Sequence, residues 1–307
     1  MNEKTLQGLI IKSQSGFFDV KTTEANPISC QLRGRLKQGG PKGDLLAVGD
    51  RVRISILPEG TGMIEEILPR ERAIVRMDPR PRGLYKQILL ANPDQAVFVF
   101  ACTNPSPRLR MLDRFLVIAE QQEIPAVIVA NKVDLLGEEE AKKIFGHYAK
   151  IGYKVLYTSA QEKTGIDILR YTLEGKLSAL AGPSGVGKSS LMNTMQPGLG
   201  LEVEEISQSL NRGKHTTNFR QLLPLEGGGY VADTPGWKAL ALWDTEPEEL
   251  DGYFPEIAQL VPLCRFNDCS HVHEPGCAVL DAVRSGELHS ERFNSFIRMR
   301  DGLSNKR

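Results

Sequence analysis

The stretch Gly182-Pro-Ser-Gly-Val-Gly-Lys-Ser189 decides the fold of this chain. It matches the pattern G-x-x-x-x-G-K-[ST] and lies between an expected strand, Lys176 to Ala181, and an expected helix, Lys188 to Met195. Its glycines let backbone N–H groups close around phosphate oxygens, and the helix adds its positive N-terminal end. The pattern therefore predicts a phosphate-binding loop in an α/β domain. The residues expected to line this loop are Gly182, Pro183, Ser184, Gly185, Val186, Gly187, Lys188, Ser189 and Ser190.

Two further patterns predict which base the bound nucleotide carries. In Asn131-Lys-Val-Asp134, the carboxylate of Asp134 can accept two parallel hydrogen bonds from guanine, whereas adenine would leave it unpaired. Asn131 either bonds the O6/N7 edge of the base or braces the phosphate loop, and the stem of Lys132 lies over the purine face. In Thr158-Ser159-Ala160, a backbone N–H can reach guanine O6. The expected base-binding residues are Asn131, Lys132, Val133, Asp134, Ser159 and Ala160.

The remaining nucleotide motifs predict the magnesium site and two switch loops. Asp233-Thr-Pro-Gly236 follows an expected strand, so that Asp233 can hold Mg²⁺ through water and the Gly236 N–H can sense the γ-phosphate. Gly213-Lys-His-Thr-Thr217 lies in a polar stretch typical of a switch loop, in which Thr216 or Thr217 supplies a second ligand to the metal. The expected Mg²⁺ ligands are Ser189, Thr216, Thr217 and Asp233.

The hydrolytic residue is less directly indicated. Trp237 follows Gly236, at the position where Ras-like proteins carry the glutamine that orients water. His215 is the candidate to replace that glutamine, and a loop histidine with no role in catalysis is the alternative. Arg212 or a group from a partner would supply the positive charge of an arginine finger. The expected catalytic set is His215, Lys188, Thr216, Thr217 and Gly236.

The motifs occur in a rotated order. An ordinary G domain runs from the phosphate loop through the switch threonine, DxxG and NKxD to the SA motif, whereas this chain begins with NKVD and ends with DTPG. The cyclic order is kept, which predicts a circularly permuted domain built on the same sheet. As a consequence, the second switch runs directly into the C-terminal segment, and the nucleotide state can move that segment mechanically.

Composition and patterning predict the other units. The 307 residues are 41% hydrophobic and 25% charged, which fits a folded protein of two or three domains. Short alternating strands near the N-terminus, expected over 8–12, 17–21, 28–37, 51–57 and 62–68, predict a β-barrel of the oligonucleotide-binding (OB) type, with an SH3-like barrel as the alternative. Helices are expected near 166–173, 188–195, 247–254, 278–285 and 290–302. The expected domains are an OB-type barrel over 1–69, a basic linker over 70–91, a permuted α/β G domain over 92–243 and a mainly α zinc-binding domain over 244–307.

Charge and hydropathy limit the partners. The formal net charge is zero, but the linker is basic, so that either a phosphate backbone docks on it or it is a solvated connection. No apolar run approaches the roughly 20 residues that span a bilayer, so we expect a cytoplasmic protein with no membrane partner. The basic side chains of the linker are Arg70, Arg72, Arg76, Arg80, Arg82 and Lys86.

Three cysteines cluster near the C-terminus together with two histidines. Cys264, Cys269 and Cys277 with one imidazole suit a closed tetrahedral zinc site that staples a small domain. His271 and His273 compete for the fourth position, and spacing alone does not decide between them. Unligated reduced cysteines are the alternative.

With the barrel, the rotated motifs and the pattern C-x4-C-x-H-x-x-E-P-x-C, the whole chain resembles the ribosome small subunit-dependent GTPase A family of circularly permuted bacterial GTPases. The resemblance favours His271 as the zinc ligand. It implies one structural zinc ion, magnesium with GTP, contacts of barrel and zinc domain with 16S rRNA, and GTP hydrolysis stimulated by the small (30S) subunit. Lys214 departs from the arginine expected in this family, with the charge retained.

The resemblance implies a late assembly checkpoint, in which the GTP form docks on the small subunit and hydrolysis drives release. We expect the protein to act as a monomer that binds GTP and GDP. Two alternatives remain open: an RNA-binding scaffold that holds GTP with little hydrolysis, suggested by Trp237, and a permuted GTPase that acts on the large subunit. The barrel and the cysteine cluster argue against the second alternative.

Overall fold

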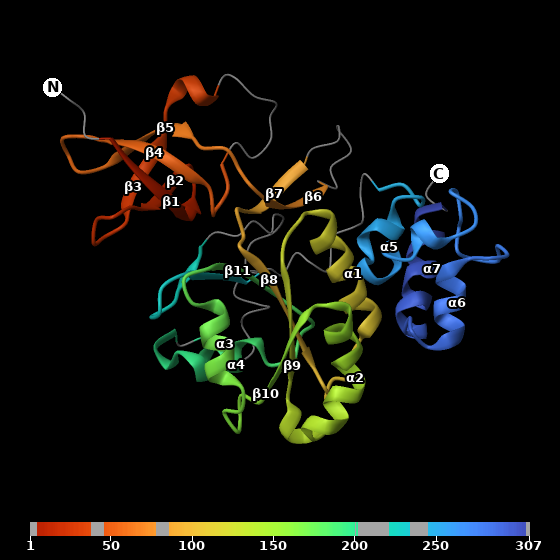
Figure 1. The fold of residues 1–307 in the computed structure, drawn as a ribbon. Coiled ribbons are helices and arrows are strands. Elements are labelled where there is room, and N and C mark those ends of the chain that lie inside the picture. The colour runs from red at the N-terminus through yellow and green to blue at the C-terminus, as the bar shows by residue number, and fades with distance from the viewer. Residues whose placement is uncertain are drawn as a thin grey trace.

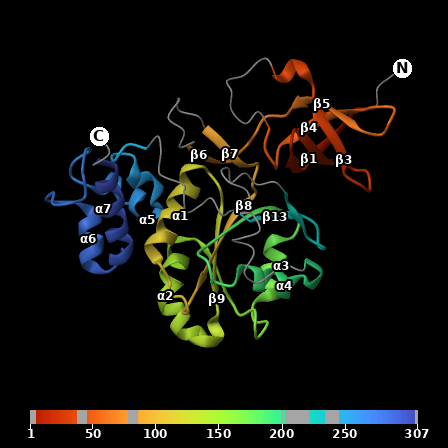
Figure 2. The same ribbon diagram turned by 180° about the vertical axis from the view of Figure 1, so that it is seen from behind.

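The computed structural model describes residues 5–37, 46–77, 86–199, 201, 221–233 and 245–304. Figure 1 shows an N-terminal barrel, a central sheet flanked by helices, and a small helical unit at the C-terminal end of the chain. The barrel and the helical unit lie on different sides of the central sheet, as the reverse view in Figure 2 also shows. Among the described residues, no helix has both the length and the apolar character that crossing a membrane requires.

The N-terminal unit is a closed barrel with the strand order β1-β2-β3-β5-β4. β1 pairs with both β2 and β4 and so closes the ring, and the pairing of β3 with β5 is parallel. Side chains from all five strands fill the barrel, and Ile10, Val20 and Ile54 are fully buried there. This arrangement confirms the five-stranded OB-type barrel. The strands are β1 (Thr5–Gln14), β2 (Phe17–Lys21), β3 (Ile28–Leu32), β4 (Arg51–Ile56) and β5 (Gly62–Ile67).

The third strand is shorter than the sequence predicts. We expected it to run from residue 28 to residue 37, but β3 ends at Leu32 and the 3-10 helix η1 (Gly34–Lys37) follows. Gly34 interrupts the run of side chains that would extend the strand, because glycine weakens strand interiors.

The central unit is a six-stranded sheet with the order β10-β9-β8-β11-β13-β12, in which only the β12–β13 pair is antiparallel. Successive side chains of β8 alternate between two cores, as the two faces of a strand require. Its buried apolar sequence is therefore typical of a sheet covered on both faces. The strands are β8 (Gln95–Ala101), β9 (Ala126–Asn131), β10 (Lys154–Thr158), β11 (Leu177–Ala181), β12 (Leu223–Pro224) and β13 (Tyr230–Asp233).

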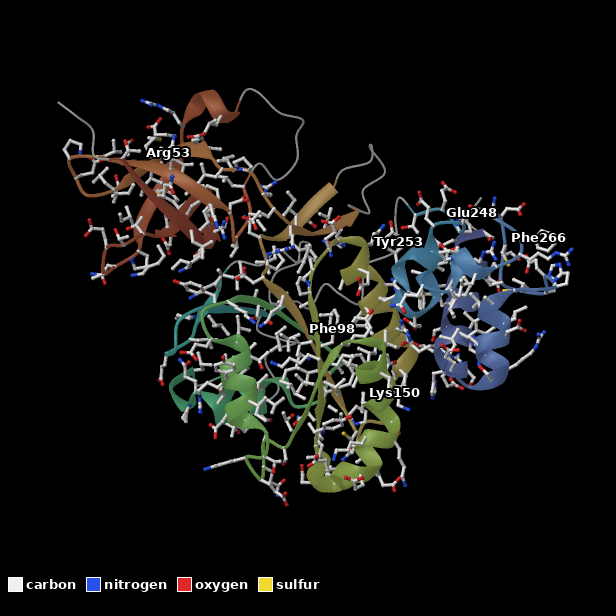
Figure 3. All side chains as sticks on the ribbon, viewed as in Figure 1. Arg53, Phe98, Lys150, Glu248, Tyr253 and Phe266 are labelled. Carbon is white, nitrogen blue, oxygen red and sulfur yellow. The ribbon has the colours of Figure 1, made fainter. Side chains whose placement is uncertain are left out.

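Helices cover the two faces in pairs. α1 (Leu109–Gln121) and α2 (Glu138–Ile151) pack on one face, where Phe98 contacts Phe115 with ring centroids 5.5 Å apart. α3 (Ile166–Leu173) and α4 (Lys188–Met195) pack on the other face. Figure 3 shows Phe98 inside this unit. The observed sheet and helices confirm the predicted α/β G domain.

The segment interpreted as a basic linker contains paired strands. β6 (Ala73–Met77) and β7 (Lys86–Ala91) form a separate antiparallel sheet that the sequence did not reveal. Part of its positive charge is used within the fold, because Arg70 pairs with the buried carboxylate of Asp50 at 2.6 Å and Arg76 donates to Gln87 at 2.6 Å. Arg80 and Arg82 lie outside the described residues. The domain limits stay a prediction.

The C-terminal unit differs from expectation at its first helix. We expected one helix near residues 247–254, but the chain forms the 3-10 helix η5 (Leu250–Tyr253), turns at Phe254 and starts α5 (Pro255–Ala258). Proline disfavours a helical conformation in the preceding residue and fits the first turn of a helix, so that Pro255 ends one element and begins another. The 3-10 helix η6 (Val261–Leu263) follows, and α6 (Ala278–Ser285) and α7 (Ser290–Ser304) lie where the sequence predicts helices.

A buried ionic network joins the C-terminal unit to the central domain. The guanidinium of Arg292 on α7 is 0% exposed and bonds Glu256 through two nitrogens at 2.6 and 3.2 Å. It also bonds Asp113 of α1 at 2.9 Å, and Asp113 accepts a further hydrogen bond from the hydroxyl of Tyr148 on α2 at 2.7 Å. Burial lowers the pKa of Arg292, but the two carboxylates outweigh this effect and raise it. Arg292 therefore stays charged and ties three elements together.

Removal of this guanidinium should destabilise the protein strongly. Arg292→Ala leaves two carboxylates without their buried partner, for which we expect a loss of about 3–5 kcal/mol in the free energy of unfolding. Arg284→Ala is the matched control, since Arg284 pairs with Asp281 on the surface at side-chain exposures of 73% and 64%. We expect that control to change stability by less than about 0.5 kcal/mol. Urea unfolding of both variants measures the difference, and equal losses would contradict the proposed role of the network.

Candidate guanine-nucleotide site and metal cluster

The phosphate loop connects the middle of the sheet to α4. β11 ends at Ala181 and α4 begins at Lys188, with Gly182, Gly185 and Gly187 at positive φ between them. A Cβ on Gly182 would lie 2.1 Å from the carbonyl oxygen of Val99, so that only glycine lets the loop pass this close to β8. The loop takes the strand-turn-helix form that the sequence pattern predicts.

Lys188 folds back over the loop. Its ammonium group donates to the carbonyl oxygens of Gly182 and Pro183, each at 3.0 Å. The charge therefore lies on the concave side of the loop, where it can meet phosphate oxygens. The next residue, Ser189, is buried in the first turn of α4.

The NKVD motif braces the loop from the neighbouring strand. The side-chain amide of Asn131 donates to the Val186 carbonyl at 2.8 Å, and its oxygen accepts from the Thr158 hydroxyl at 3.1 Å. A Cβ on Gly187 would lie 2.5 Å from the Asn131 amide nitrogen, which explains a glycine there. Of the two roles considered for Asn131, the structure shows the bracing role. Lys132 adds to the brace by donating to the Gly185 carbonyl at 2.7 Å and to the Asn104 carbonyl.

Four of the six predicted base-binding residues line one pocket beside the loop. This pocket has a volume of about 410 Å³, large enough for a small ligand, and it brings together the ends of β9 and β10 with helix α4. Ser159 is fully buried and does not itself line the pocket, and its hydroxyl accepts from the Glu162 N–H at 3.0 Å. Asp134 therefore lies at a pocket next to the phosphate loop, as selection of a base requires. The residues that line the pocket are Asn131, Lys132, Asp134, Leu135, Ala160, Gln161, Gly187, Ser190, Asn193 and Thr194.

The predicted switch and catalytic residues fall largely outside the described part of the chain. His215, Thr216, Thr217 and Gly236 lie there, and so do Arg212, Lys214 and Trp237. Asp233 ends β13 beside β11, but its side chain is likewise outside the described part. Among the four predicted Mg²⁺ ligands, the structure therefore places the side chain of Ser189 alone.

The cysteine cluster has the geometry of a metal site. One ligand atom from each of its four residues lies within 4.8 Å of the others. Nδ1 of His271 faces two of the sulfurs, 3.6 Å from Cys264 and 3.4 Å from Cys277. Burial raises the pKa of the Cys269 thiol to about 12, so that a cation is needed to stabilise a thiolate there. The four residues are Cys264, Cys269, His271 and Cys277.

Groups around the cluster support a bound ion. The second ring nitrogen of His271, Nε2, is buried, has no hydrogen-bond partner among the described residues and lies 3.5 Å from the Asp251 carboxylate. A carboxylate in this position is typical behind a histidine that ligates zinc. His273 is exposed and is not one of the four residues that come together in the cluster. The donor set and its surroundings therefore fit one tetrahedral zinc ion with His271 as the nitrogen ligand.

The loop that carries His271 is held by a carboxylate. Glu274 accepts backbone N–H groups from Ser270 at 2.8 Å, Val272 at 3.0 Å and His273 at 3.0 Å, and it also accepts the Ser270 hydroxyl. The Ser270 hydroxyl bond and the backbone N–H groups lower the pKa of Glu274. His271 adopts a positive φ of 60° in this loop. Glu274 thus presents the histidine to the sulfurs.

Sequence reasoning missed several groups that shape these sites. Asn104 contributes through its carbonyl oxygen, Thr194 hydrogen bonds the Ala160 carbonyl at 3.2 Å, and Asp251 lies far from the cluster in sequence. None of these residues belongs to a recognisable motif. Glu274 is the exception, because the E-P pair within the cysteine pattern could have indicated it.

A phosphate loop after a central strand, base-binding motifs after the neighbouring strands and a rotated motif order define a circularly permuted P-loop GTPase. Sequence models of the RsgA GTPase and of the RsgA N-terminal domain match residues 67–243 and 7–64. The chain belongs to the RsgA family and is a GTP hydrolase.

Individual relatives are similar over nearly the full length. The small ribosomal subunit biogenesis GTPase RsgA of Gemmatimonas aurantiaca is 43% identical, with 96% of this chain and 97% of the relative aligned. The crystal structure of YjeQ from Thermotoga maritima matches with a TM-score of 0.81 at 36% identity, covering 99% of this chain and 100% of that one. YloQ, a circularly permuted GTPase, matches with a TM-score of 0.77 at 31% identity, covering 99% and 96%. The permuted fold predicted from the motif order is thereby confirmed.

Substitution of Asp134, the carboxylate predicted to select the base, should change nucleotide preference. Asp134→Asn removes an acceptor of two guanine N–H groups, and each charge-assisted bond contributes about 1.5–3 kcal/mol. We expect the dissociation constant for GDP to rise by a factor of about 10 to 100 or more. Xanthosine diphosphate should bind better than to the wild type, because the new amide can donate to the xanthine O2. Fluorescence competition measures both dissociation constants, and unchanged GDP binding would contradict the assignment of Asp134.

Proposed function

We propose that this GTPase acts on the small ribosomal subunit as a late checkpoint of its assembly. The GTP form docks on the maturing 30S particle, contact with the particle stimulates hydrolysis, and the GDP form leaves. The observation that carries the proposal is the near full-length similarity to a protein named small ribosomal subunit biogenesis GTPase. The protein acts in the cytoplasm, where bacterial subunits assemble. It acts there as a monomer.

The architecture supports RNA contacts at both ends of the molecule. OB-type barrels bind oligonucleotides on the face of their strands, and small zinc modules commonly bind RNA. The barrel and the zinc unit flank the nucleotide-binding domain (Figure 1), so that two contacts with 16S rRNA can depend on one nucleotide state. A membrane partner is not part of the proposal.

Hydrolysis is assigned to the switch residues and the phosphate loop. Lys188 would neutralise charge on the β- and γ-phosphates, while Ser189, Asp233 and a threonine at 216 or 217 would hold Mg²⁺, which would supply further positive charge for hydrolysis. The Gly236 N–H contacts the γ-phosphate, and His215 orients the attacking water. The position of Lys188 over the loop carbonyls supports its role.

Ribosomal particles should discriminate between the functions considered. GTP turnover by the full chain is measured alone, with purified 30S subunits and with purified 50S subunits. We expect 30S subunits to increase turnover and 50S subunits to leave it unchanged, because the docking surfaces are proposed to fit 16S rRNA. Unchanged turnover with 30S would contradict the proposed function, and stimulation by 50S alone would favour action on the large subunit.

Zinc content should depend on His271 and not on His273. The cluster predicts about one zinc ion per chain, since four protein ligands close the tetrahedron of a structural site. His271→Ala removes a buried ligand, so that we expect less zinc and a lower midpoint of thermal unfolding. His273→Ala is the matched control, because that side chain is exposed two residues away. Atomic emission gives the zinc content, and equal loss in both variants would refute the assignment.

A further inference from the structure

The loop of residues 159–165, here called the base loop, is held partly by its own hydrogen bonds. The Ser159 N–H donates to the Thr164 carbonyl at 3.0 Å, and the Glu162 N–H donates to the Ser159 hydroxyl at 3.0 Å. These bonds use two of the backbone donors in the loop. The N–H groups of Ala160 and Gln161 have no partner among the described residues, and both residues line the pocket. They are therefore the donors that can meet a ligand.

One side chain ties this loop to the phosphate-binding helix. The hydroxyl of Thr194, in the last turn of α4, donates to the Ala160 carbonyl at 3.2 Å. α4 begins at Lys188, directly after the phosphate loop, and runs over eight residues to Met195. The Thr194 bond thus fixes the distance between the part of the site that binds phosphate and the part that contacts the base.

The hydrogen bond from Thr194 also fixes the direction in which the Gln161 N–H points. The Ala160 carbonyl and the Gln161 N–H belong to one planar trans peptide, in which the two groups point to opposite sides. When Thr194 holds the carbonyl on the side of α4, the N–H must point away from α4. The adjacent Ala160 N–H is constrained by the same short loop, whose start is anchored at the buried Ser159.

We propose that Thr194 is a positioning residue for guanine recognition, which aims the N–H groups of the base loop at the O6 oxygen of the base. The inference rests on the proposed guanine pocket and deepens it. Thr194 acts through Ala160 and does not itself select the base. Its effect is therefore confined to the O6 edge, whereas Asp134, at the end of a different strand, reads the N1 and N2 edge.

Binding of GDP and two analogues distinguishes contacts to the O6 edge from contacts to the N1 and N2 edge. 6-thio-GDP replaces O6 by sulfur, a weaker acceptor, and keeps the groups that Asp134 contacts. IDP keeps O6 and lacks the exocyclic amine. Dissociation constants for GDP and both analogues are measured by fluorescence competition with the full chain of the wild type, Thr194→Val and Thr194→Ser.

The valine variant should lose discrimination at one edge only. It keeps the shape of threonine without the donor, so we expect GDP to bind about three- to tenfold more weakly, the effect of one hydrogen bond. 6-thio-GDP should be affected less, so that the preference for GDP over 6-thio-GDP falls while the preference over IDP is kept. Thr194→Ser retains the hydroxyl, so that its affinity for GDP and its preference for GDP over 6-thio-GDP should match those of the wild type. Thr194→Ala repeats the test if the valine variant does not fold.

Each other outcome is decisive. An unchanged preference for GDP over 6-thio-GDP in the valine variant would overturn the positioning role. A parallel loss of both preferences would also overturn it, because it would show a general structural role. A wild-type protein with no preference for GDP over IDP would instead contradict the guanine pocket, and so the proposed function, whatever the variants do.

Discussion

The hydrogen bond from the Asn131 side chain to the Val186 carbonyl is the contact on which the nucleotide site depends. It joins the end of β9 to the phosphate loop after β11, two strands that are separated in the sheet by β8. Parallel strands present their carboxyl ends at one edge, and this bond sets the spacing between base and phosphate at that edge. The Asn131 amide fits beside residue 187 only because glycine has no side chain there.

That constraint explains why a rotated chain can build the same site. The bond needs the ends of β9 and β11 at the same edge of the sheet, with β8 between them, and does not depend on which strand comes first in the sequence. With β11 in the middle of the sheet, the chain can enter at β8 and leave after β13 without breaking any strand pair. The break falls between segments that lead to other units, namely the barrel before the sheet and the zinc cluster after it.

The sequence predicted those features that depend on local pattern. The helices at Ile166–Leu173, Lys188–Met195 and Ala278–Ser285 begin and end at the residues that the sequence predicted. The pair β6 and β7 was missed because the basic residues of that segment favoured a linker, although both strands are mostly apolar. The bracing role of Asn131 and the carboxylate of Asp251 arise from contacts between distant segments, which no local pattern records.

The C-terminal unit is attached to the G domain in two ways, which have different consequences for its motion. The chain after Asp233 links it to the second switch, whereas Arg292 locks α7 onto α1 and α2 through buried charges. A buried pair that breaks leaves uncompensated charge, so α7 and α1 move together. α1 in turn follows the loop whose Asn104 carbonyl accepts Lys132 beside the base pocket. A nucleotide-dependent motion of the C-terminal unit must therefore carry α1 with it, so that rotation about the switch alone is incompatible with the intact network.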